Sequence, residues 1–141
     1  MRLATFYGPA MRPALAPAIF LDKIHNNEPI EIHGSGNQTR TMTYVDDIVN
    51  GIVLIAETEP KHTIINITTE EIVSVLDMIK FSEEIVGRSS TCNYVPDRKG
   101  QILEEVIHSK RLQSLGWKPL TTFKDGLIKS YEYYKNNNFK W

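Results

Sequence analysis

The sequence predicts an α/β fold. Short apolar or β-branched runs alternate with segments of helical periodicity, Gly and Pro mark the turns between them, and neither an internal repeat nor a low-complexity stretch interrupts the pattern. Parallel pairing is expected where a helix connects two strands. The chain has 141 residues with 41% hydrophobic and 23% charged content, so one domain, 1–141, is expected.

The N-terminal quarter predicts a strand, a helix and a second strand. Residues 2–7 have β-compatible composition and stop at the turn signal of Gly8 and Pro9. Apolar residues then recur at helical spacing over 15–24, and Asn26 and Asn27 end that run. Residues 30–33 predict a strand that leads into a glycine-containing turn.

The clearest helical pattern covers residues 45–56, where the apolar positions fall on one face. Thr43 and Asp46 have the spacing of a capping box at its start. Asp46 and Asp47 also resemble an acid pair, but a position at a helix start favours capping and stabilisation of the helix dipole over acid/base chemistry.

A β-branched run at 63–67 predicts a buried strand that feeds a further helix. Thr68 and Glu71 suggest a second capping box, and Gly87 ends the helix. The remaining expected elements are a strand at 92–95, a short helix at 109–115 and a longer helix at 123–134.

Composition and charge exclude several classes of protein. The 16 basic and 17 acidic residues give a net charge of −1, so we expect no nucleic-acid partner and no binding to an anionic membrane. The longest apolar stretches are too short to span a bilayer, which favours a cytoplasmic location. The single Cys92 and four scattered His residues lack metal-ligand spacing, so no metal site is expected.

Four segments resemble, in order and spacing, the C-terminal part of NAD-dependent sugar-nucleotide epimerases and dehydratases of the extended short-chain dehydrogenase/reductase family. They are RLATFYGP at 2–9, GSGNQTRTMTYVDDIVNGI at 34–52, YVPDRKG at 94–100 and SKRLQSLGWKP at 109–119. The resemblance implies a Rossmann-type fold that includes the substrate-binding lobe.

In that family a glycine-rich turn holds the NAD pyrophosphate, and a Tyr-x-x-x-Lys pair precedes the strand that corresponds to 2–7. Neither motif occurs here in the family's position, so the resemblance implies a nucleotide-sugar-binding portion without the N-terminal cofactor-binding segment and without catalytic residues. Tyr131 precedes Lys135 by four residues, but on a late helix, and we interpret it as a core residue.

The resemblance places Arg40 and Arg98 where such enzymes bind the diphosphate of the sugar nucleotide. A guanidinium is permanently charged and donates paired hydrogen bonds to phosphate oxygens, which suits this role. The alternative for each is an ordinary solvated surface arginine. The expected ligand is a UDP-, dTDP- or GDP-linked sugar, and the resemblance does not decide which.

Other positions are implied by the same resemblance. His33 matches the wall against the nucleotide base, with an exposed strand-end histidine as the alternative. The resemblance also implies that Leu15 lines the base pocket, with ordinary core packing as the alternative. Thr5 stands where many relatives have an asparagine that contacts the diphosphate. Tyr7, Gly8 and Pro9 match the turn that passes the nicotinamide, at the carboxyl end of a strand where α/β proteins bind ligands.

The sequence therefore leaves two alternative functions. The first is the substrate-binding part of a nucleotide-sugar 4-epimerase or 4,6-dehydratase that acts through a transient 4-keto sugar with NAD. The second is a non-catalytic binding or interaction module, either a split subunit or a degenerate paralogue. Unpaired strand edges and an apolar face would also make the chain a homo-oligomer through residues 2–7 or 45–56.

Overall fold

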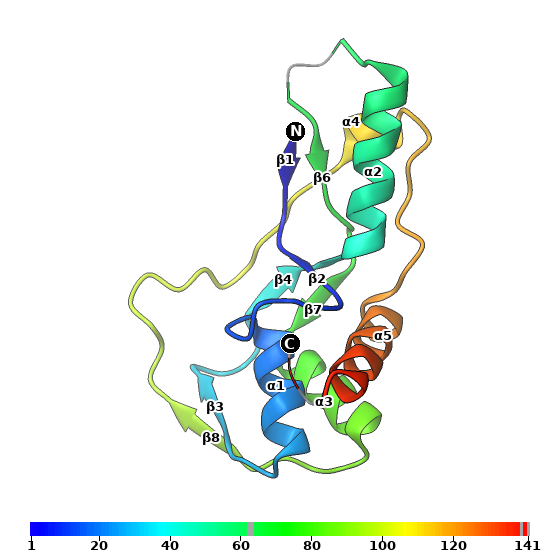
Figure 1. Ribbon diagram of the computed structural model, residues 1–141. Helices are drawn as coiled ribbons and strands as arrows, with labels where there is room; N and C mark the ends of the chain where they lie inside the picture. Colours follow the sequence, from blue (N-terminus) through cyan, green and yellow to red (C-terminus); the bar gives the residue numbers. More distant parts are fainter. Residues whose placement is uncertain (62–63, 139, 141) are drawn as a thin grey trace.

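A computed structural model describes residues 1–61, 64–138 and 140. Figure 1 shows a larger body built around three helices and a smaller body above it, with short strands running between the two. The elements are β1 (Arg2–Leu3), β2 (Phe6–Tyr7), α1 (Ala16–His25), β3 (Ile30–His33), β4 (Thr39–Thr41), β5 (Thr43–Tyr44), α2 (Val45–Thr58), β6 (Asn66–Ile67), β7 (Ile72–Ser74), α3 (Val75–Val86), β8 (Cys92–Val95), α4 (Lys110–Gln113) and α5 (Phe123–Asn136).

Within the described residues, the strands form four two-stranded pairs. Three of them are parallel, namely β1 with β6, β2 with β5 and β3 with β8, while β4 and β7 pair antiparallel. The predicted α/β class and the expected parallel pairing are therefore confirmed.

The predicted strand at 2–7 is interrupted. Its first part pairs with β6 and its second part with β5. The partner changes at Ala4 and Thr5, where the Ala4 N–H donates to the Ile67 carbonyl at 3.2 Å and the Thr5 carbonyl accepts from the Thr43 N–H at 3.0 Å. The prediction of a single continuous strand at 2–7 was therefore wrong, because two different neighbouring strands supply the hydrogen bonds.

The helices follow the predicted apolar spacing closely. In α1 the extended residue Leu15 is the N-cap, Pro17 sits in the first turn, and Asn26 follows as the C-cap. In α5, which covers the helix predicted at 123–134, one face is buried and includes Phe123, Leu127, Tyr131 and Tyr134. No helix in the described ranges is both long enough and apolar enough to cross a membrane.

Both predicted capping boxes were wrong. The N-cap of α2 is Tyr44, without a side-chain cap, and the Thr43 hydroxyl instead accepts from the Thr69 N–H at 2.8 Å. The helix expected after Thr68 begins later: Ile72 belongs to β7, and the capping box of α3 is formed by Ser74 and Asp77.

Two further differences concern strands. The β4 and β7 pair was not predicted, because three-residue strands such as Thr39–Thr41 are too short to show a period of two. Of the strand predicted at 63–67, the structure assigns Asn66–Ile67 to β6, and Thr63 lies outside the described residues.

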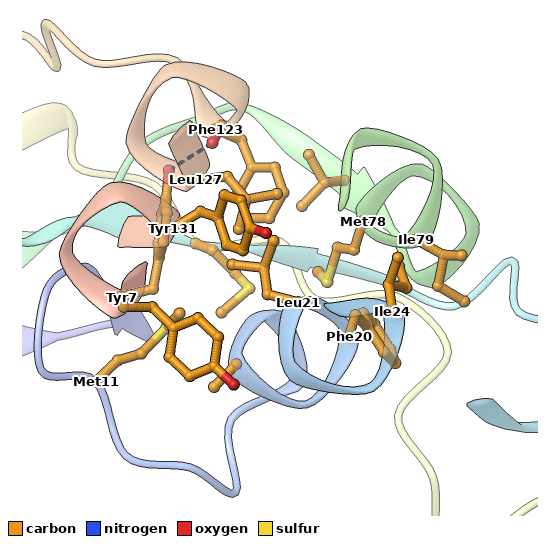
Figure 2. Packing of buried hydrophobic residues seen from close by; sticks show 14 of the residues in the cluster. Tyr7, Met11, Phe20, Leu21, Ile24, Met78, Ile79, Phe123, Leu127 and Tyr131 are labelled. Carbon is orange, nitrogen blue, oxygen red and sulfur yellow. Dashed lines mark hydrogen bonds between the residues drawn. The ribbon is translucent and has the colours of Figure 1, made fainter. Parts of the chain in front are cut away.

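The apolar side chains gather into two clusters. The larger lies among α1, α3 and α5 and includes Tyr7, Leu21, Met78 and Phe123 (Figure 2). The smaller joins α2 to the α4 region and includes Ile48, Ile67, Leu112 and Trp117. Trp117 and Tyr131 are thus packing residues, which for Tyr131 confirms the interpretation from the sequence.

Candidate functional site

A cavity of about 430 Å³ opens beside the carboxyl end of β2. Its wall combines the end of this strand, the following loop, the residue before α1 and the first residue of α2. Five of the predicted site residues lie in it: Thr5, Tyr7, Gly8, Pro9 and Leu15. The other lining residues are Ala4, Phe6, Ala10, Met11, Arg12 and Val45.

The loop after β2 packs closely on the start of α2. A Cβ atom at Gly8 would lie 2.6 Å from Cγ1 of Val45, and Gly8 has a φ of +155°. A side chain at this position would therefore push the loop away from the helix. Ala10, two residues on, has a φ of +58°, which is uncommon for a residue other than glycine.

The Tyr7 side chain is directed into the core and away from the cavity. It is 1% exposed, and its hydroxyl donates to the Phe123 carbonyl at 2.9 Å. Burial is the main cause that raises the pKa of the Tyr7 hydroxyl, followed by the nearby Glu71 carboxylate. Tyr7 therefore remains a neutral hydrogen-bond donor, and the residue lines the cavity together with Gly8 and Pro9.

Arg12 is a lining residue that the sequence analysis missed. It is exposed, and among the described residues that line the cavity it alone carries a charge. The signal was present in the sequence, since Arg12 stands in the loop between the end of a strand and the next helix, where α/β proteins bind ligands. Together with the exposed Thr5 hydroxyl, Arg12 gives an otherwise apolar cavity two donors suited to an anionic group.

His33, Arg40 and Arg98 do not line this cavity. His33 ends β3, with Nδ1 3.4 Å from the Pro96 carbonyl, and its own carbonyl accepts from Nε2 of Gln38 at 3.0 Å. The neighbouring Gly34 has a φ of +73°, and a Cβ atom there would lie 1.9 Å from Oδ1 of Asp97. The loops that follow β3 and β8 are therefore in direct contact.

The two predicted phosphate-binding arginines occupy different settings. Arg40 lies in β4 and is half-buried, and its Nη1 donates to the Thr39 carbonyl at 2.6 Å. Arg98 is exposed in the loop that follows β8. Its carbonyl accepts from the Gln101 N–H at 3.0 Å, which closes a turn and leaves the guanidinium facing solvent.

Nothing in the described part of the chain resembles a metal centre, since no three His, Cys, Asp or Glu side chains come together there. Cys92 is a half-buried free thiol beside the Ser90 hydroxyl.

Comparison with known proteins gives the chain a family. The sequence model of the NAD dependent epimerase/dehydratase family matches residues 1–68. A probable UDP-glucuronate 4-epimerase of Rhizobium meliloti is 30% identical over 96% of this chain and 46% of its own length. A dTDP-D-glucose 4,6-dehydratase of Homo sapiens is 28% identical over 99% of this chain and 42% of its own length.

Solved structures agree. The chain superposes on the UDP-glucose 4-epimerase of Thermotoga maritima, crystallised with UDP-glucose, with a TM-score of 0.88, 30% identity and coverage of 97% of this chain and 45% of that one. For the UDP-glucuronic acid 4-epimerase of Bacillus cereus, crystallised with UDP-glucuronic acid and NAD, the TM-score is 0.85, with 33% identity and coverage of 96% and 44%. The chain spans less than half the length of these relatives. It belongs to the NAD-dependent epimerase/dehydratase family, within the extended short-chain dehydrogenases/reductases, and has the corresponding part of their Rossmann-type fold.

Proposed function

We propose that this chain is the nucleotide-sugar-binding part of an NAD-dependent 4-epimerase that acts on a UDP-linked uronic acid. The observation that carries this proposal is the placement of Arg12 and Thr5 in one otherwise apolar cavity. A guanidinium and a hydroxyl are complementary to a sugar carboxylate, and Arg12 would favour an acidic sugar over a neutral one.

The relatives support the same substrate class. UDP-glucuronate 4-epimerases from Rhizobium meliloti and Bacillus cereus are 30% and 33% identical to this chain. Thr5 would then provide a hydroxyl to the sugar, which gives a reason for a threonine where many relatives have an asparagine.

The diphosphate and the base would bind outside the cavity. Arg40 and Arg98 supply the cations for the diphosphate, and His33, at the end of β3, supplies a ring that can stack on uracil. For Arg40 this requires that Nη1 exchange its bond with the Thr39 carbonyl for a phosphate oxygen.

NAD, when bound, accepts and returns a hydride during such a reaction. The described residues fit only one side of this cofactor. The backbone of residues 7–9 offers a wall at the carboxyl end of β2, but the strand-to-helix connections of the described chain include no glycine-rich turn for a pyrophosphate. We therefore assign no chemical step to these residues, whose task is to bind and orient the sugar nucleotide.

Calorimetric titration with UDP-glucuronic acid, UDP-glucose and dTDP-glucose tests the proposal. We expect UDP-glucuronic acid to bind about tenfold more tightly than UDP-glucose, the difference one charge-assisted contact makes. Arg12→Gln should remove this preference and leave the affinity for UDP-glucose unchanged. Arg88→Gln is the matched control, because Arg88 donates to the His25 carbonyl and does not line the cavity. Equal affinities of the wild type for both UDP-sugars would contradict the assignment of an acidic sugar.

A further inference from the structure

The backbone of one residue, Phe123, connects the cavity to the strand pair that carries Arg40. The Phe123 carbonyl accepts from the Tyr7 hydroxyl at 2.9 Å, and the Phe123 N–H donates to Oε2 of Glu71 at 2.7 Å. Figure 2 shows the first of these bonds as a dashed line between Tyr7 and the start of α5. The first residue of α5 is thus held from two sides by Tyr7 and Glu71, which are far apart in the sequence. This pair of hydrogen bonds on Phe123 is called the clamp below.

The Tyr7 side of this clamp belongs to the cavity wall. Tyr7 lies between Thr5 and Gly8, and its ring packs on those of Tyr44 and Phe123, with ring centroids 5.8 Å and 5.0 Å away. The close approach depends on Gly126, one turn further along α5, because a Cβ atom there would lie 2.3 Å from the Tyr7 hydroxyl oxygen. The helix therefore fixes the position of the Tyr7 side chain.

The Glu71 side of the clamp belongs to β7. Glu71 directly precedes this strand, and Val73 is the register partner of Arg40 in β4. Any shift of Glu71 relative to α5 therefore shifts the strand pair that positions the Arg40 backbone.

We propose that Tyr7 is a positioning residue that, through the backbone of Phe123 and through Glu71, holds the cavity wall bearing Thr5 and Arg12 in register with the strand bearing Arg40. A ligand that contacts both the cavity wall and Arg40 in β4 binds to two surfaces that are already arranged for it. The affinity of a ligand that contacts only Arg40 does not depend on the clamp. This inference rests on the proposed function, which places the sugar in the cavity and the diphosphate on Arg40.

Amide hydrogen exchange on the ligand-free chain tests the mechanical link. Tyr7→Phe removes only the hydroxyl, and we expect faster exchange both in residues 5–12 and in the strands β4 and β7. Glu71→Ala removes the other hydrogen bond of the clamp and should increase the rate of amide exchange in the same two regions. Tyr44→Phe is the matched control, because the Tyr44 ring packs on that of Tyr7 but its hydroxyl has no hydrogen-bond partner among the described residues. Acceleration confined to residues 5–12 in Tyr7→Phe would overturn the link.

Titration then tests the consequence for binding. We expect Tyr7→Phe and Glu71→Ala to weaken the binding of UDP-glucuronic acid about fivefold to tenfold, as the loss of one hydrogen bond of the clamp permits, while the Kd for UDP changes less than about twofold. A general loss of stability would lower the affinity for UDP-glucuronic acid and for UDP alike, and that result would reject the positioning role. If the wild type binds neither ligand, the proposed function fails, and the exchange experiment still decides whether the clamp exists.

Discussion

The Asp47 carboxylate and the Leu120 N–H are joined by a 3.0 Å hydrogen bond that spans 73 residues of sequence. The second carboxylate oxygen accepts from the Thr121 N–H at 3.1 Å, and the Asp47 carbonyl accepts from the Trp117 indole at 3.1 Å. Asp47 is 1% exposed. The start of α2 therefore anchors the turn that leads into α5, and with it the clamp on Phe123.

Replacing Asp47 by Asn should destabilise the fold. An amide presents one acceptor and one donor to two N–H groups, so one backbone donor is left unsatisfied in a buried place. We expect a loss of about 2 kcal/mol in the free energy of unfolding, measured by urea denaturation. Asp46→Asn is the control, since Asp46 is exposed at the same helix start and should cost about 0.5 kcal/mol through the helix dipole. Equal losses in both variants would mean that Asp47 acts only on the dipole.

Asp47 also shows why the helices could be predicted and the hydrogen bonds of the polar residues at their starts could not. Apolar spacing of 3.6 residues is a local property, and it located α1, α2 and α5 within a residue or two at each start. At the start of α2 the polar residues have partners distant in sequence: Asp47 bonds the turn before α5, and Thr43 bonds the Thr69 N–H. No local pattern distinguishes such a tertiary partner from a capping box.

The candidate site was predictable only in part, for a similar reason. The turn at Gly8 and Pro9 was expected to border a ligand, and these residues line the cavity. Arg12 was missed, because a surface arginine in a loop is ordinary until the fold shows that its loop closes a cavity. The roles of Arg40, Arg98 and His33 remain predictions, since they lie outside the cavity and depend on where a ligand's diphosphate and base would bind.

The capping box of α3 predicts a pH dependence. The Ser74 hydroxyl, and then the Ser74 N–H, are the main causes that lower the pKa of the Asp77 carboxyl below its ordinary value of 3.8. A carboxyl with a lowered folded-state pKa contributes stability above its unfolded pKa and loses it as the pH falls through the folded value. We expect Asp77→Asn to cost about 1 kcal/mol at pH 7 and progressively less below the ordinary pKa of Asp77, in denaturation curves recorded across that range. A constant difference down to strongly acid pH would contradict a role for the ionised carboxylate.

Thr41 and Thr43 form a matched pair for the cost of an unpaired hydroxyl. Both are 1% exposed, but the Thr43 hydroxyl accepts from the Thr69 N–H, whereas the Thr41 hydroxyl has no hydrogen-bond partner in the described structure. Thr41→Val should therefore be neutral or stabilising by up to about 1 kcal/mol, and Thr43→Val should cost about 1–2 kcal/mol. Thermal unfolding of the two variants side by side decides this, and a destabilised Thr41→Val would show that its hydroxyl binds a buried water.

Arg40 and Arg98 should each contribute to the affinity for the diphosphate. We expect Arg40→Ala and Arg98→Ala to raise the Kd for UDP-glucuronic acid about tenfold, because each removes a charge-assisted hydrogen bond. Titration with UDP should show the same loss, which separates these residues from Arg12. Arg88→Ala should leave both constants unchanged. Wild-type affinity in both site variants would return Arg40 and Arg98 to the class of ordinary surface arginines.

The last prediction concerns self-association. Val49 and Val53, one turn apart on α2, are 50% and 47% exposed, and Leu3 and Phe6 in the first two strands are 43% and 47% exposed. In the described structure β1 pairs only with β6, and β2 only with β5. Apolar side chains beside open strand edges favour association, so we expect this chain, studied by itself, to sediment as a dimer or larger oligomer at micromolar concentration.

Val53→Glu should shift the oligomer toward the monomer if α2 forms the contact, whereas Ile128→Glu, at a 37% exposed position on α5, should not. If Val53→Glu leaves the oligomer intact, β1 and β2 form the contact, and Phe6→Glu should then dissociate it. A wild-type monomer that binds no hydrophobic dye would refute the prediction for both surfaces.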